Sequence, residues 1–133
     1  MKQIRPYFLF FTLAIFLTIA CKKNNETTPA TAPTLTIASP VETDQPSNGQ
    51  TLKIKGQVGD AAGLHTLTIK ITDDKTGAVL FQSTPSVLDA KTYILDTSWT
   101  IKVSDWTDAT MTITAANHAG LKTEKVVKFK VWL

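Results

Sequence analysis

Apolar and polar residues alternate along most of the chain after residue 33. Successive side chains of a β-strand point to opposite faces, so each alternating run places its apolar members on one face. The intervening residues are mainly Thr and Lys, which suits strands with one face in water. The apolar positions of these runs are Leu35 and Ile37; Leu52, Ile54 and Val58; Leu67, Ile69 and Ile71; Val79 and Phe81; Tyr93, Leu95, Trp99, Ile101 and Val103; Met111, Ile113 and Ala115; and Val127, Phe129 and Val131.

Turn-forming residues separate the runs. Pro46–Gly49, Gly59–Gly63, Asp73–Gly77 and Asn117–Gly120 lie between neighbouring runs, and Pro85–Ala90 forms a longer crossing. No segment has a helical period, and no internal repeat is present. Short strands at this spacing are typical of two antiparallel sheets packed face to face. We therefore expect residues 34–133 to form one all-β domain of about seven strands.

Two motifs give this domain a family resemblance. Asp60 to Ile71 reads Asp-Ala-Ala-Gly-Leu-His-Thr-Leu-Thr-Ile-Lys-Ile and resembles the Asp-x-x-Gly-Val/Leu-x-x-Val/Leu-x-Val pattern of bacterial immunoglobulin-like and cadherin-like modules. Ala115 to Leu121 resembles their Ala-x-Asp-x-Ala-Gly-Asn turn, with Asn and Leu replacing Asp and Asn. The resemblance implies an immunoglobulin-like antiparallel β-sandwich, a fold that does not by itself imply a function. Leu64 and Leu67 break the alternation by one residue, which predicts a turn or bulge where the strand begins.

The N-terminus has the organisation of a secretory signal. Lys2 and Arg5 precede the apolar run Tyr7–Ala20, which ends at Cys21, the only cysteine. A run of about 14 residues is too short to span a bilayer, which takes roughly 20. The arrangement resembles a bacterial lipoprotein signal, and the whole chain resembles small lipoproteins of Bacteroidota. We expect a signal peptide over residues 1–20, and a lipidated Cys21 with a flexible tether over residues 21–33; an ordinary signal that leaves a free thiol is the alternative.

The lipoprotein resemblance also implies a location. An acylated Cys21 would hold the protein on a membrane through its lipid chains. Lys22 follows it where an Asp would favour retention in the inner membrane, so the resemblance favours the outer membrane. Whether the domain faces the periplasm or the cell exterior stays open.

The charge of the chain gives no reason to expect a nucleic-acid partner. The full sequence has 14 Lys and Arg against 11 Asp and Glu, a net charge of +3. Loss of Lys2 and Arg5 with the signal would leave 12 against 11. The lysines are scattered along the expected strands and do not cluster into a phosphate-binding face.

No catalytic motif or cofactor-binding motif is present. Gly-x-Ser-x-Gly and His-Glu-x-x-His are absent, and Gly56–Gly59 is not followed by the Gly-Lys-Ser/Thr of a phosphate loop. We therefore expect a protein that is not an enzyme and has no cofactor. A hydrolase, the weakest alternative, would need a concave pocket with at least two converging acids.

Metal binding has only weak candidates. His65 and His118 lack the closely spaced partners of a zinc site, so we expect no transition-metal site. Asp60, Asp73 and Asp74 lie in expected loops and are weak candidates for calcium, which prefers clustered oxygen ligands. Hydrogen bonds that fix turns are the simpler role for these carboxylates.

The three tryptophans are the most informative residues for ligand binding. Trp99 shares a face with Ile101 and Val103, so we expect it in the core. Trp106 lies in a polar loop. Trp132 follows Val131 directly, so it is expected on the outer face of its strand, and both tryptophans are candidate binding residues. An exposed indole can stack on a sugar or anchor a protein contact. In the simpler alternative, Trp106 caps the core and Trp132 folds against a neighbouring strand.

These observations predict a lipid-anchored, non-catalytic module of the cell envelope that binds a protein partner through its loops or a sheet edge. A carbohydrate-binding accessory lipoprotein is the alternative, and it requires Trp106 or Trp132 to be exposed beside polar groups. A structural spacer would instead show a polar surface without a cleft.

Overall fold

The computed structural model describes residues 30–133. The expected signal peptide, Cys21 and most of the expected tether lie outside the described residues. Within residues 30–133, no helix is long and apolar enough to cross a membrane.

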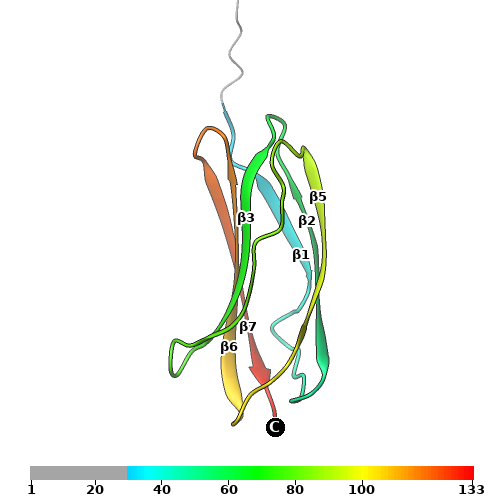
Figure 1. The fold of residues 1–133 in the computed structure, drawn as a ribbon, viewed down its shortest axis with the longest axis vertical. Helices are drawn as coiled ribbons and strands as arrows, with labels where there is room; N and C mark the ends of the chain where they lie inside the picture. Colours follow the sequence, from blue (N-terminus) through cyan, green and yellow to red (C-terminus); the bar gives the residue numbers. More distant parts are fainter. Residues whose placement is uncertain (1–29) are drawn as a thin grey trace, which may run out of the picture.

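The described chain forms seven strands in two antiparallel sheets (Figure 1). The strands are β1 (Thr34–Ser39), β2 (Thr51–Gly59), β3 (Leu64–Asp73), β4 (Val79–Ser83), β5 (Thr92–Thr100), β6 (Thr107–Asn117) and β7 (Lys122–Val131). One sheet has the order β1-β2-β5 and the other has the order β4-β3-β6-β7. The protein is an immunoglobulin-like β-sandwich, and the predicted fold class is confirmed.

The strand directions give the sandwich two distinct ends. Residues 30–33, the β2–β3 turn and the β6–β7 turn lie at one end, which we call the tether end. The β1–β2, β3–β4 and β5–β6 connections and the C-terminus lie at the opposite end, which we call the distal end (Figure 1). Because β3 alone has ten residues, the two ends are about 30 Å apart.

The core lies between the sheets and consists mainly of the alternating residues. Ile54, Val58, Leu67, Ile69, Ile71, Met111 and Ile113 are almost wholly inaccessible to solvent, as the alternation predicts. Trp99 is 7% exposed, which confirms its predicted core position. Val87 is also buried, although it lies in the β4–β5 crossing and belongs to no alternating run.

Val79 is the one predicted inward residue that the structure places in solvent, with 53% of its surface exposed. The cause is a bulge in β4: Ile71 pairs with Phe81 and Thr72 pairs with Val79, so Leu80 is an extra residue between them. An extra residue reverses the faces of the residues beyond it. Leu80 and Phe81 consequently pack against the core in place of Val79.

A second bulge lies at the start of β3, where the broken alternation predicts one. Leu64 pairs with Asn117 and Thr66 pairs with Ala116, which leaves His65 unpaired between them. Leu64 and Leu67 can therefore both be buried, while the His65 side chain is exposed.

Gly56 allows β1 and β2 to approach closely at the middle of their pairing. A Cβ atom at this position would fall on the backbone carbonyl oxygen of Thr36, and the Cα of Ile37 would be 3.2 Å away. Only glycine lacks the atom that would clash. Gly56 is thus required for the close pairing of the two strands, which is a structural role for part of the Gly56–Gly59 segment.

The last residues of the expected tether pack on the tether end of the sandwich. The Asn117 side-chain amide donates a hydrogen bond to the Thr31 carbonyl oxygen, with 2.8 Å between the atoms. The Thr123 hydroxyl donates to the carbonyl oxygen of Pro33, whose side chain is buried. These contacts fix the direction in which the chain leaves the domain.

Candidate ligand-binding groove

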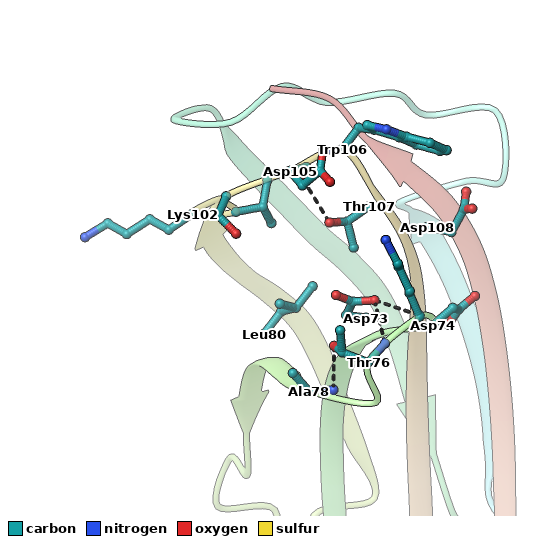
Figure 2. A pocket seen from close by; sticks show the side chains of 13 residues that line it. Asp73, Asp74, Thr76, Ala78, Leu80, Lys102, Asp105, Trp106, Thr107 and Asp108 are labelled. Atoms are coloured by element: carbon teal, nitrogen blue, oxygen red, sulfur yellow. Dashed lines mark hydrogen bonds between the residues drawn. The ribbon is translucent and has the colours of Figure 1, made fainter.

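A groove lies at the distal end, between the β3–β4 turn and the β5–β6 connection (Figure 2). Its volume is about 770 Å³. The turn contributes Asp73, Asp74, Lys75, Thr76 and Ala78, β4 contributes Leu80, and the other wall is Lys102 to Asp108. The groove is therefore formed by loops that are about 30 residues apart in the sequence.

Trp106 lies at the rim of this groove and is 57% exposed. Its backbone N–H donates to Oδ1 of Asp105 at 2.8 Å, and the Thr107 hydroxyl donates to the Asp105 carbonyl oxygen at 3.0 Å. Thr107 itself is buried, so the loop is fixed to the core directly after the indole. The structure thus presents a large aromatic side chain to solvent on a well-anchored loop.

Lys130 of β7 lies beside the indole. Its Nζ is 5.9 Å from the centre of the Trp106 ring and 3.5 Å from Oδ1 of Asp108. An ammonium group over an aromatic face is attracted by the π electrons, although the effect is modest at an exposed site. Asp108 and Lys130 are partners on the β6–β7 ladder, so the ladder positions the cation.

Four carboxylates line the groove, and each makes a contact within the protein. Asp73 Oδ1 accepts hydrogen bonds from the backbone N–H groups of Lys75 at 2.7 Å and Thr76 at 3.2 Å. Asp74 Oδ1 accepts one from the Thr110 hydroxyl. These bonds fix the turn, as expected for acids in such a loop. Because a carboxylate has two oxygens, each acid can still accept a hydrogen bond from a ligand.

Asp73 does not have the raised pKa that the general acid of a glycosidase needs. A glycosidase needs one carboxyl group that stays protonated, with a raised pKa. At Asp73, desolvation raises the pKa, but hydrogen bonds from Lys75 and Thr76 and the charge of Lys75 outweigh it and lower the pKa from 3.8. Asp73 therefore remains ionised at neutral pH and acts as an acceptor.

Trp132, the other candidate tryptophan, also lies at the distal end and is 45% exposed. Its backbone N–H donates to the Pro46 carbonyl oxygen, and its carbonyl oxygen accepts from the Asn48 N–H. Thr107 pairs with Val131 at the distal end of the β6–β7 ladder, and Trp106 and Trp132 lie one residue beyond this pair. Only Trp106 lines the groove.

The three calcium candidates lie at opposite ends of the molecule. Asp60 is buried at the tether end, where its Oδ1 accepts from the Ala62 N–H and its Oδ2 accepts from the Asn117 amide. Asp73 and Asp74 lie beyond the other end of β3, so the three cannot share an ion. Among residues 30–133, no three His, Cys, Asp or Glu side chains are arranged to hold a metal.

The two histidines meet at the tether end. Their ring centres are 4.8 Å apart, and His118 Nε2 is 2.8 Å from Oδ1 of Asp89. His65 comes from the bulge of β3 and His118 from the β6–β7 turn, so no local pattern predicts this contact. All three side chains are exposed to solvent.

The groove itself was not apparent from the sequence, although several of its residues were. The sequence shows Trp106 as an aromatic residue in a polar loop, with Asp105 and Asp108 close to it. Their proximity to Asp73 and Asp74 depends on the pairing of β3 with β6, which places the β3–β4 turn beside the start of β6. The backbone N–H of Asp74 donates to the Asp108 carbonyl oxygen and joins the two walls.

Comparison with known proteins shows likeness in structure only. No protein-family model matches the chain, and no curated protein sequence matches it. Solved structures do match, with 25 chains similar to this one. They include the fibronectin(III)-like modules of CbhA from Clostridium thermocellum, with 18% identity, a TM-score of 0.49, and coverage of 76% of this chain and 47% of that one.

Two further structures have lower scores. CopC from Methylosinus trichosporium OB3b has 13% identity and a TM-score of 0.43, over 74% of this chain and 94% of that one. Murine CRIg has 14% identity and a TM-score of 0.43, over 77% of this chain and 98% of that one. The chain thus spans about half of the CbhA structure and nearly all of the other two. At these identities the likeness concerns the fold and does not identify a ligand.

Proposed function

We propose that this protein is a lipid-anchored, non-catalytic lipoprotein of the outer membrane that binds glycans in the groove at its distal end. The observation that carries the proposal is Trp106, which is 57% exposed at the rim of a groove lined by carboxylates and hydroxyls. An indole face can stack on the C–H face of a sugar ring. Nearby carboxylates can accept hydrogen bonds from its hydroxyls.

The position of the groove agrees with a tethered binding module. Residues 30–33 lie at the tether end, and the groove lies at the other end of the sandwich (Figure 1). Cys21 is ten residues before Thr31 in the sequence. A fully extended chain of this length spans at most about 35 Å. A lipid on Cys21 would leave the groove as the part of the domain farthest from the bilayer.

Glycan binding is tested with the Trp106→Ala variant. In native gels that contain soluble polysaccharides, the unmodified domain is expected to be retarded by at least one of them, and Trp106→Ala is expected to lose the retardation because it lacks the stacking surface. Trp132→Ala removes a second exposed indole at the same end but outside the groove. This variant is expected to be retarded as strongly as the unmodified domain. Equal migration of the unmodified domain and Trp106→Ala in every gel would contradict the proposal.

The anchor is tested separately with Cys21→Ser. This change removes the sulfur that would carry the lipid, so the protein is expected to move from the outer-membrane fraction to the soluble fraction. Metabolic labelling with a fatty acid should mark the unmodified protein and not the variant. Retention of Cys21→Ser in the membrane fraction would show that another feature holds the protein there.

A protein partner that pairs with a sheet edge is a second candidate, and β5 favours it. β5 is an outer strand of its sheet and, like the outer strands β1 and β4, contains no Lys, whereas β7, an outer strand of the other sheet, contains four. Charged residues, Lys above all, protect an edge from pairing with other chains. β5 is the longest of the three Lys-free outer strands and exposes Ile94 to 62%, so its edge is less protected than that of β7. Polysaccharide gels without any retardation, together with partner binding that survives Trp106→Ala, would favour this function.

A further inference from the structure

The charges around Trp106 restrict the kind of glycan that the groove can accept. Asp73, Asp74, Asp105 and Asp108 line it together with only two cations, Lys75 and Lys102. Lys130 lies just outside the lining and is 3.5 Å from Asp108. Even when Lys130 is counted, carboxylates outnumber ammonium groups.

The contacts of these groups decide how the charge is distributed. The Asp108 charge is partly offset by Lys130, and the Asp73 charge is stabilised by the N–H groups of its own turn. Asp74 accepts its side-chain hydrogen bond from a neutral hydroxyl, that of Thr110. The wall formed by the β3–β4 turn contains Lys75 as its one cation beside Asp73 and Asp74, so it keeps a net negative charge where a bound sugar would meet it.

Lys130 also limits the orientation of the ligand on Trp106. Its ammonium group lies over the indole ring and occupies one face. The residue is still 57% exposed with Lys130 in place, so a second face is accessible. A ligand on the side of Lys130 would have to displace this ammonium group, so the opposite side of the indole is the more favourable one for stacking.

From these observations we infer that the groove selects glycans without acidic groups, bound with one sugar ring on the free face of Trp106 and with hydroxyls donating to the groove carboxylates. This inference rests on the proposed glycan-binding function. Neutral sugars can donate to carboxylates that remain ionised at neutral pH. A uronic acid would instead bring its own negative charge within a few ångströms of the Asp74 wall and would be repelled.

The inference is tested by isothermal titration of the domain with hexasaccharides of β-1,4-linked glucose, xylose, mannose and N-acetylglucosamine, and with hexagalacturonate. At low salt we expect at least one neutral hexasaccharide to bind roughly tenfold or more tightly than hexagalacturonate. Because salt screens exposed charges, the difference should shrink at about 0.5 M NaCl.

Two charge variants test the cause of the selectivity. Lys102→Gln removes a cation at the edge of the groove, where the lysine side chain extends outward (Figure 2), and should weaken hexagalacturonate binding by a further roughly twofold to threefold, more than it changes the binding of neutral hexasaccharides. Asp74→Asn should shift hexagalacturonate binding in the opposite direction. Lys55→Gln, an exposed residue of β2 outside the groove, makes the same change as the first variant and should alter neither affinity.

The outcomes separate this inference from the proposed function. If hexagalacturonate binds as tightly as the best neutral hexasaccharide and Trp106→Ala abolishes both, the charge selectivity is wrong while glycan binding in the groove stands. If neither the hexasaccharides nor the polysaccharides bind in a Trp106-dependent way, the proposed function itself is wrong. If Lys55→Gln acts like Lys102→Gln, the selectivity comes from the overall charge and not from the groove.

Discussion

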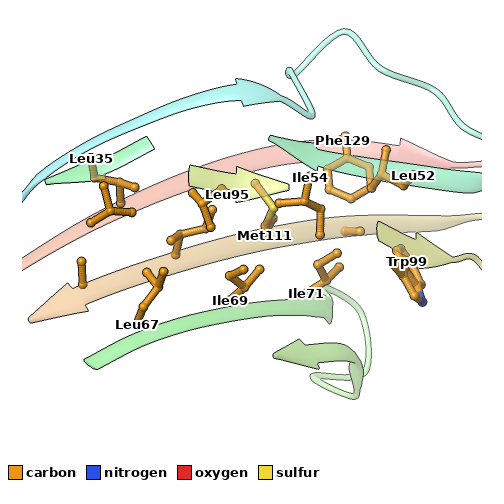
Figure 3. Packing of buried hydrophobic residues seen from close by; sticks show 14 of the residues in the cluster. Leu35, Leu52, Ile54, Leu67, Ile69, Ile71, Leu95, Trp99, Met111 and Phe129 are labelled. Atoms are coloured by element: carbon orange, nitrogen blue, oxygen red, sulfur yellow. The ribbon is translucent and has the colours of Figure 1, made fainter. Parts of the chain in front are cut away.

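Trp99→Ala is expected to lower the free energy of unfolding by about 3–5 kcal/mol. Trp99 is 7% exposed, pairs with Leu52 across the β2–β5 ladder, and has its ring centre 6.5 Å from that of Phe81 on the opposite sheet. Figure 3 shows it at one end of the row of buried side chains, beyond Ile71. Removing the indole leaves a cavity between the sheets that the surrounding strands can only partly close.

The measurement is urea unfolding of the domain, followed by circular dichroism so that the loss of a tryptophan does not change the signal. A domain of about 100 residues should also lose more than roughly 12 °C in Tm. Trp106→Ala deletes the same side chain from an exposed site and should change the unfolding free energy by no more than about 0.5 kcal/mol. Similar values for the two variants would mean that Trp99 is not a core residue.

The second large effect is expected at Asn117, which joins three segments at the tether end. Its amide nitrogen donates to the Thr31 carbonyl oxygen at 2.8 Å and to Asp60 Oδ2 at 3.0 Å, and its Oδ1 accepts from the Leu121 N–H at 3.1 Å. Asn117 is 2% exposed. Asn117→Leu should cost about 2–4 kcal/mol, because it leaves the buried Asp60 carboxylate without this donor and also removes the bonds to Thr31 and Leu121.

Asn117→Asp tests the same site through its pH dependence. The new carboxylate keeps the acceptor for Leu121 but places an oxygen against Asp60 Oδ2, where the amide nitrogen stood. Two ionised carboxylates at this distance repel each other, and sharing a proton between them removes the repulsion. The deficit in unfolding free energy relative to the unmodified domain should therefore be largest near pH 7 and shrink as the pH falls towards 4.

Asn48→Asp is the matched control for this pH dependence. Asn48 lies at the distal end, and its Oδ1 accepts from the Val103 N–H at 3.0 Å. A carboxylate at this exposed position keeps the acceptor without replacing an amide that faces a buried acid. A deficit at Asn117→Asp that does not change between pH 7 and pH 4 would show that repulsion by Asp60 is not its cause.

Asn117 also shows how much a motif can predict. The resemblance identified a turn at Ala115–Leu121 and noted Asn where the pattern has Asp. It could not show that this side chain faces Asp60, 57 residues earlier, because that contact depends on the pairing of β3 with β6. The substitution of an amide for an acid is explained by the neighbour: an amide can donate to the buried Asp60 carboxylate, and an ionised acid cannot.

The three tryptophans also show which features follow from a local pattern and which depend on tertiary structure. Alternation correctly separated buried Trp99 from exposed Trp132, because the face of a strand residue depends on its position in the run. Trp106 lies in a loop, where no period operates, so its exposure could not be derived from the pattern. The groove beside it required the β3–β4 turn to lie next to the β5–β6 connection.

The one wrong local prediction, the inward position of Val79, has a structural cause. A bulge adds one residue to a strand and reverses the faces beyond it, and its position depends on the partner strand. The bulge of β3 was visible because Leu64 and Leu67 have the wrong spacing for a simple strand. The bulge at Leu80 lies in a strand of five residues, too short for the alternation to reveal it, so Val79 was assigned to the wrong face.

The sequence by itself determined that the domain is made of strands with one apolar face, and how the turns divide them, because both properties depend on the order of neighbouring residues. Only the tertiary structure decided which strands pair, and with them the distal groove, the Asn117 contacts and the meeting of His65 with His118. The contacts of Asn117 with Asp60 and Thr31 join residues 57 and 86 positions apart. The physical reason is that strand pairing brings together segments that no local pattern connects.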